Sequence, residues 1–173
     1  MIENKYNLGL RVIHWLMAIL IIGMICAGFY MKSLPVTNEM KFNIYAIHKA
    51  CGITILGLVI VRILFRMLTH VPPLTINISR LTVCLSKTVH LGLYATMLLM
   101  PLSGYVMSSA SGREIKYFFH IPLLISKNEK LASTANQLHS MLAYFTVLLI
   151  TLHIVGALKH ILVDKYNILK RMV

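Results

Sequence analysis

Four long runs of apolar residues follow one another along the chain, separated by shorter polar segments. They cover residues 11–31, 40–68, 81–107 and 131–162. Each run has the roughly 20 residues that a helix needs to cross about 30 Å of hydrocarbon. Pro35, Pro72, Pro73 and Pro122 stand in the segments between them, where they interrupt helical structure. The pattern therefore predicts an all-α membrane protein, a bundle of four transmembrane helices.

Composition supports one membrane domain that occupies residues 1–173. The chain is 58% hydrophobic and only 13% charged, and the four spans with their loops use its whole length. This leaves no room for a separate soluble catalytic domain, and no P-loop, dinucleotide-binding or hydrolase motif is present. The first run is too long for a signal peptide and no small-residue cleavage pattern follows it, so we expect a retained helix. Any chemistry must then take place within the bundle.

Basic residues gather beside the apolar runs and do not form one stripe. The formal net charge is +12, from 17 Lys and Arg against five Asp and Glu. This placement is typical of contact with anionic lipid headgroups, so we expect membrane lipid as a partner and no nucleic acid.

The same residues predict the orientation of the helices. The side of the membrane with both termini carries ten Lys and Arg: Lys5, Arg11, Arg62, Arg66, Arg80, Lys87, Lys159, Lys165, Lys170 and Arg171. The other side carries seven: Lys32, Lys41, Lys49, Arg113, Lys116, Lys127 and Lys130. The positive-inside rule therefore predicts a multi-pass protein of a cell membrane with both termini in the cytoplasm.

Histidines supply the candidate chemistry. The chain has eight, and five lie within the spans: His14, His48, His90, His139 and His153. Ionisable residues are costly inside a membrane and indicate a functional site, although one such histidine alone is often an interhelical hydrogen-bond partner. Because successive helices alternate in direction, we expect His14, His90 and His153 in the cytoplasmic half. His48 and His139 then lie in the outer half.

The spacing of two histidines on the last helix indicates two separate ligand layers. His139 and His153 are 14 residues apart, about 21 Å along a helix, with a net rotation of only about 40°. The two imidazoles thus share one face at different depths, and each needs a partner from another helix. Such layers fit two haems whose irons have imidazole on both sides, an arrangement that favours electron transfer. Depth alone leaves His14 and His90 as alternative partners for His153.

Glycines and cations near these histidines are candidates for holding the rest of each haem. Gly52 lies one turn after His48 and leaves space for a flat ring, although close helix packing would favour the same residue. Propionates need cations, and the candidates are Arg11, Arg62, Arg66 and Lys159 on the inside and Lys49 outside, with lipid contact as the alternative role. His90 is a candidate for a hydrogen bond to a propionate or a quinone, or to another helix.

Several segments together resemble the bacterial cytochrome b561 family, which is similar to the cytochrome b subunits of nickel-iron hydrogenases and formate dehydrogenases. They are Arg11-Val-Ile-His14-Trp15, His48-Lys49-Ala-Cys51-Gly52, the pair His139 and His153, and Leu158-Lys159-His160 through Met172. The resemblance covers nearly the whole chain and implies two b haems in the inner membrane. It implies that His14 and His153 ligate the inner haem iron, and His48 and His139 the outer one. Many relatives have a second histidine where this chain has Ile161, so we give His160 no role.

Three functions are compatible with these features. The first is a two-haem electron carrier that exchanges electrons with ubiquinone, and the resemblance suggests superoxide as a donor, since some family members oxidise it. The second is a membrane anchor that accepts electrons from a periplasmic dehydrogenase. The third, from a different class, is a transporter or structural bundle without haem, whose histidines relay protons or join helices. The haem content of the purified protein separates the third from the other two.

Overall fold

The computed structural model describes residues 5–73, 79–116 and 120–173, and four long helices make up most of them. These are α1 (Leu8–Ser33), α2 (Glu39–Leu68), α3 (Arg80–Ala110) and α4 (Glu129–Leu162). All four are long and apolar enough to span a membrane. The prediction of an all-helical membrane protein with four spans is therefore confirmed.

Each helix begins a few residues before the apolar run that predicts it, because a polar side chain caps its first turn. The caps are Asn7, Asn38, Ser79 and Asn128, which accept hydrogen bonds from the backbone N–H groups of Gly9, Met40, Thr82 and Leu131. Such caps satisfy N–H groups that have no partner within the helix. The cap positions explain why the apolar pattern gave the right elements with slightly short bounds.

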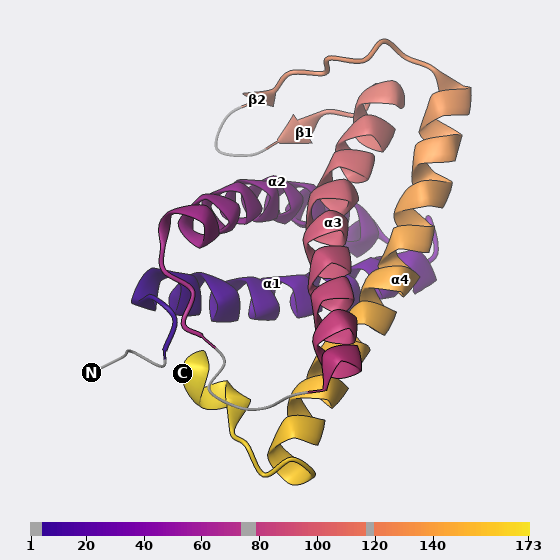
Figure 1. Cartoon of the computed structure of the whole chain (residues 1–173). Coiled ribbons are helices and arrows are strands. Elements are labelled where there is room, and N and C mark those ends of the chain that lie inside the picture. The colour runs from indigo at the N-terminus through magenta and orange to yellow at the C-terminus, as the bar shows by residue number, and fades with distance from the viewer. Residues whose placement is uncertain (1–4, 74–78, 117–119) are drawn as a thin grey trace.

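The helices pair as two antiparallel hairpins, α1 with α2 and α3 with α4, as Figure 1 shows. A cluster centred on Met17, Ile55 and Val59 holds the first hairpin together, and Met97 and Leu98 of α3 pack against it. These contacts join the two hairpins through α2 and α3. Histidines on α1 and α2 are thereby brought opposite α4.

Large apolar side chains cover the outside of the helices. Ile19, Leu91 and Met141, for example, are about 70% exposed in the isolated chain. A soluble monomer rarely exposes so much contiguous apolar surface, whereas lipid tails would cover it without cost. The surface therefore agrees with four helices that each face lipid.

The described residues before α1 meet the C-terminal segment at one end of the molecule, which we call the terminus side (Figure 1). The backbone N–H of Tyr6 donates to the carbonyl of Arg171, 3.0 Å away, in the short helix η1 (Ile168–Arg171). The Arg171 side chain is 7% exposed and donates to the carbonyls of Pro72 and Pro73 in the loop after α2. Arg66 and Arg171 also lie over the Tyr6 ring, at 5.2 and 5.4 Å from its centre. One arginine thus ties the C-terminal segment to the N-terminal segment and to the second loop.

The opposite end, which we call the loop side, carries the turn between α1 and α2 and the long connection between α3 and α4. In this connection α3 extends to Ala110, and two short strands, β1 (Ile115–Lys116) and β2 (His120–Ile121), pair in antiparallel fashion. The short interfacial segment that the polar and aromatic residues of 108–130 allow stays a prediction. The aromatic residues at 117–119 lie outside the described residues. Tyr105 closes the connection by donating to the carbonyl of Pro122 at 2.8 Å.

Replacement of Arg171 by leucine is expected to destabilise the terminus side by about 1–3 kcal/mol, because two carbonyl acceptors lose their donor. Thermal unfolding in detergent and limited proteolysis of the C-terminal segment measure this. Arg171→Lys should recover only part of the loss, since lysine keeps the charge without the planar fork. The matched control is Lys170→Leu at the exposed neighbouring position. Equal effects of the two leucine variants would contradict the role given to Arg171.

Candidate functional site

Four of the five intramembrane histidines form two pairs that bridge the hairpins. On the terminus side, His14 of α1 faces His153 of α4, with ring centres 6.3 Å apart and an angle of 70° between the rings. On the loop side, His48 of α2 faces His139 of α4, with ring centres 6.3 Å apart and an angle of 73°. We call these the terminus-side pair and the loop-side pair.

The separation of the rings fits one metal ion held between each pair. A metal–imidazole bond is about 2.0–2.1 Å, and a ring nitrogen lies about 1.1 Å from the ring centre. Two imidazoles on opposite sides of one metal ion therefore have centres roughly 6.2–6.5 Å apart. Among the described residues, no group of three or more His, Cys, Asp or Glu side chains is arranged to hold a metal ion. Two protein ligands per centre suit an iron whose other four ligands come from a porphyrin.

His90 also lies at the terminus side, but its position differs from that of a second axial ligand. Its ring centre is 5.1 Å from that of His153, which is too short for a metal ion between the two rings. Its Nδ1 lies 3.4 Å from the hydroxyl of Ser86 on its own helix. The geometry thus favours His14 over His90 as the partner of His153, a choice that depth alone leaves open.

The loop-side histidine of α4 is oriented by α3. His139 Nδ1 lies 2.9 Å from Ser103 Oγ and 3.1 Å from the carbonyl of Met100. A carbonyl only accepts, so Nδ1 carries the proton and Nε2 keeps a free lone pair. A Cβ on Gly104 would lie 3.2 Å from the His139 ring, so a side chain at this position would press on the ring. Sequence reasoning missed all three residues of α3, although Ser103 and Gly104 interrupt an apolar run and could have indicated a site.

Two glycines lie near the loop-side pair, Gly28 on α1 and Gly52 one turn after His48 on α2. A Cβ at Gly28 would lie 3.6 Å from His48, and a Cβ at Gly52 would meet only the end of the Met24 side chain, 4.0 Å away. Close helix packing therefore does not explain Gly52. His48 Nδ1 is buried, with no hydrogen-bond partner in the described part of the chain. A buried polar atom without a partner is costly, and this one fits a site that a bound group completes.

The terminus-side pair has a cation beside it. Arg62 Nη2 lies 3.2 Å from His14 Nδ1, and Arg62 Nε donates to the hydroxyl of Tyr94 at 3.3 Å. The Trp15 ring packs edge-on against His14, with ring centres 5.3 Å apart, and its Nε1 donates to the carbonyl of Met172 at 2.9 Å. The C-terminal segment thus fixes the tryptophan that borders this pair. Sequence reasoning missed Tyr94, and it includes Trp15 only as the last residue of the segment from Arg11 that carries the family resemblance.

The other cations expected near propionates differ in whether a partner already holds them. Arg11 Nε is buried, and no hydrogen-bond partner is found for it within residues 5–73, 79–116 and 120–173, so it fits an incoming carboxylate. Lys49 donates to the carbonyl of Glu114 at 2.6 Å, and Lys159 forms an ion pair with Asp164 at 2.9 Å. The hydrogen bond from Lys159 lowers the pKa of Asp164. Arg11 is therefore better placed than Lys49 and Lys159 to pair with a propionate, whereas Arg62 already contacts Tyr94 and His14.

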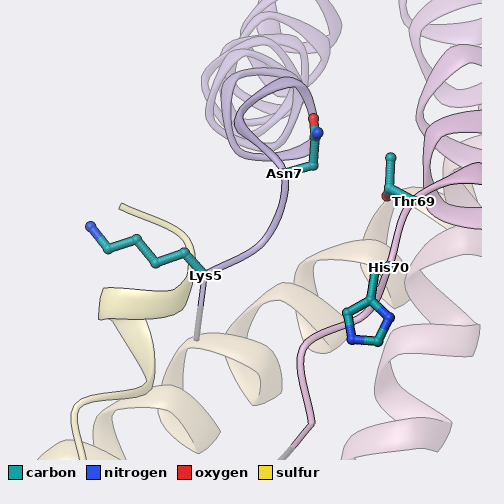
Figure 2. A pocket seen from close by; sticks show the side chains of 4 residues that line it. All are labelled: Lys5, Asn7, Thr69 and His70. Carbon is teal, nitrogen blue, oxygen red and sulfur yellow. The ribbon is translucent and has the colours of Figure 1, made fainter. Parts of the chain in front are cut away.

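A polar pocket of about 260 Å³ lies apart from both pairs, on the terminus side (Figure 2). Lys5, Asn7, Thr69 and His70 line it. Asn7 caps α1 and the Thr69 hydroxyl donates to the carbonyl of Phe65 at 2.6 Å, so two of the four side chains already serve helix ends. In Figure 2 the Lys5 side chain points away from the other three. These side chains do not converge on a common point.

A four-helix membrane protein with two interhelical histidine pairs at different depths has the architecture of a membrane cytochrome b. Comparison with known sequences agrees: residues 5–173 match the family described as prokaryotic cytochrome b561, and the chain belongs to that family. It is 32% identical to cytochrome b561 homolog 2 of Escherichia coli (strain K12) over 98% of this chain and 91% of that protein. It is 31% identical to the probable superoxide oxidase CybB of Yersinia pestis, over 98% of this chain and 96% of that one.

Membership in this family gives the class of function. The chain is a bacterial multi-pass membrane protein of electron transfer, and the family implies b-type haem. The cytochrome b561 resemblance seen in the sequence is thereby confirmed.

Proposed function

We propose that the chain binds two b haems, with the terminus-side pair as axial ligands of one iron and the loop-side pair as ligands of the other. The observation that carries the proposal is the repeated 6.3 Å separation of ring centres at two positions 14 residues apart on α4. Haem supplies one-electron transfer, and an iron held by two imidazoles has no open position for oxygen chemistry. The protein in this proposal is an electron carrier across the membrane.

The residues around each pair have separate tasks in this proposal. Met100 and Ser103 hold His139 with Nε2 free to bind, and Gly104 leaves room for its ring. Arg11, whose buried Nε has no other partner in the described residues, holds a haem propionate by a charge-assisted hydrogen bond. The apolar helices exclude water, which strengthens these electrostatic contacts.

We propose the orientation and the partners from charge. The terminus side, with ten Lys and Arg against seven, faces the cytoplasm, so the loop side faces outward. Ubiquinone is the proposed electron acceptor, because a carrier that is embedded in lipid needs a partner soluble in lipid. Superoxide is the proposed donor at the loop side, which makes the protein a superoxide:ubiquinone oxidoreductase. The name of the Yersinia pestis relative and the net positive loop side support this choice.

The direct test of the haem proposal is a count. Protein produced with ample haem should contain two non-covalent haems per chain, measured by pyridine haemochrome against total protein, because the chain has no CxxCH attachment motif. A redox-difference spectrum should show low-spin b haem. A ratio near one haem per chain, or none, contradicts the proposal.

Gly104→Ala is expected to weaken haem retention at the loop side, because the new Cβ would press on the His139 ring at 3.2 Å. The measured result is a fall in haem content toward one per chain after washing in detergent. Gly92→Ala is the matched control, since its Cβ would meet Leu149 at 3.0 Å in the same interface between α3 and α4. The control should lower thermal stability while both haems stay bound. Equal haem loss in the two variants would contradict the role of Gly104.

A further inference from the structure

The two histidine pairs differ in what surrounds the Nδ1 atom of one ring in each pair. At the loop side, His139 Nδ1 has two acceptors within reach, the carbonyl of Met100 and the hydroxyl of Ser103. The Ser103 hydroxyl itself donates to the same carbonyl at 2.8 Å, so its lone pairs remain available to the ring N–H. At the terminus side, His14 Nδ1 has the Arg62 guanidinium at 3.2 Å instead.

This difference changes the electron density of the two rings. An imidazole that binds a metal through Nε2 and donates Nδ1–H to a carbonyl becomes a more basic ligand. A stronger ligand stabilises the oxidised, more positive iron. A guanidinium is always charged and only donates, so it cannot accept a proton from a ring N–H.

Arg62 must therefore release Nδ1 when His14 binds iron through Nε2. Its bond to the Tyr94 hydroxyl and its place over the Tyr94 ring, 5.8 Å from the ring centre, keep the guanidinium beside the pair. A positive charge that stays close favours the reduced, less positive centre. The neighbours of the two pairs thus act in opposite directions.

The remaining charges strengthen this asymmetry. Arg66 lies one turn after Arg62, over the ring of Tyr6, and adds a second positive charge on the terminus side. Lys49 follows His48 directly, but its ammonium turns to the carbonyl of Glu114 in the connection after α3. No acidic side chain is recorded in contact with either pair among the described residues.

We infer that Arg62 and Ser103 are positioning residues that make the two haems unequal, with the higher reduction potential at the terminus side and the lower one at the loop side. With both haems bound, transfer of one electron from the loop side to the terminus side would be favourable. This inference rests on the proposed function, because it needs both haems. It gives the carrier a preferred direction, from the loop side to the terminus side.

The experiment is a redox titration of the full-length protein with its haems, followed by absorbance and electron paramagnetic resonance. The unaltered protein should show two one-electron waves. Variants in which one ligand histidine is replaced should lack one haem, and the wave that disappears identifies that haem. Loss of a terminus-side ligand should remove the higher wave. Arg62→Gln should lower the midpoint potential of that wave by at least about 59 mV. For one electron, this is a tenfold change in the ratio of reduced to oxidised haem at a given potential. Arg62→Lys should restore most of it.

The loop-side wave should respond to a different residue. Ser103→Ala should raise the midpoint potential of this wave, with a few-fold change in the ratio of reduced to oxidised haem. The effect is small because the Met100 carbonyl still accepts from His139, and Ser103→Thr should restore the original potential. Two controls match these changes. Lys87→Gln removes one exposed charge from α3, and Thr96→Val removes a buried hydroxyl of the same helix that bonds to the carbonyl of Leu93. Neither control should move either wave.

The possible failures are distinguishable. Fewer than two haems per chain contradicts the proposed function itself. Two haems with one shared potential, or with the higher potential at the loop side, overturn the inference alone. Equal shifts of the midpoint potentials in Lys87→Gln and Arg62→Gln also overturn the inference, because the net charge of the protein, and not the position of Arg62, would then cause the shift. The order of potentials in the unaltered protein needs no variant, so the inference stays testable if Arg62→Gln does not fold.

Discussion

His14→Ala and His153→Ala are each expected to remove the proposed terminus-side haem and leave the loop-side haem bound, so the chain should retain about half of its haem. His48→Ala and His139→Ala are expected to remove the loop-side haem instead. The physical reason is that an iron held by two imidazoles, 6.3 Å apart between ring centres, loses one of its only two protein ligands. Pyridine haemochrome gives the amount of haem, and the low-spin resonances show which haem is lost.

His90→Ala is the matched control for these variants. His90 lies on α3 beside His153, so its removal alters the same surroundings without removing a proposed ligand. Both irons should stay six-coordinate and low-spin. Loss of a low-spin signal in His90→Ala, together with an unaltered His14→Ala, would show that His90 and not His14 ligates the terminus-side iron.

The sequence predicts the parts of this molecule that depend on local pattern. Four apolar runs predicted the four helices, because a helix that crosses a membrane needs about 20 apolar residues in a row, and segments of soluble proteins rarely contain such a run. The interval from His139 to His153 placed two rings on one face of α4, and the structure does set a histidine of the first hairpin opposite each of them. Helical geometry alone carries this information from sequence to space.

The contacts between hairpins could not be read in the same way. The choice between His14 and His90 depends on how α1 and α3 approach α4, and that depends on the packing of Met17, Ile55 and Val59. The Met100 carbonyl that accepts from His139 belongs to the backbone, so the residue type at position 100 does not indicate this hydrogen bond. Lys159 is one of the candidates for a propionate, and its ion pair with Asp164, five residues later, is a contact that the sequence pattern does not specify.

Reduction by superoxide is expected to be fast at low salt and to slow as the ionic strength rises. The loop side carries seven Lys and Arg against Glu39, Glu114 and Glu129, which leaves it at +4. A positively charged loop-side surface next to the loop-side pair would raise the encounter rate of a small anion by roughly ten- to a thousand-fold. Salt screens this attraction, with a Debye length of about 8 Å at 0.15 M. Superoxide would give one electron to the loop-side haem and leave as dioxygen.

Two variants that lose the same charge at opposite ends of the molecule distinguish an effect of loop-side charge from an effect of the net charge of the chain. The triple substitution of Lys49, Arg113 and Lys116 by glutamine should lower the rate measured by stopped-flow absorbance and flatten its dependence on salt. The control replaces Lys5, Lys165 and Lys170 by glutamine, which removes the same charge from the terminus side. That variant should change the rate much less than the loop-side variant, because α4 alone, with 34 residues and about 50 Å of helix, separates the two ends. Slow reduction that ignores salt would exclude superoxide as the donor and leave a quinone-linked carrier supplied by another reductant.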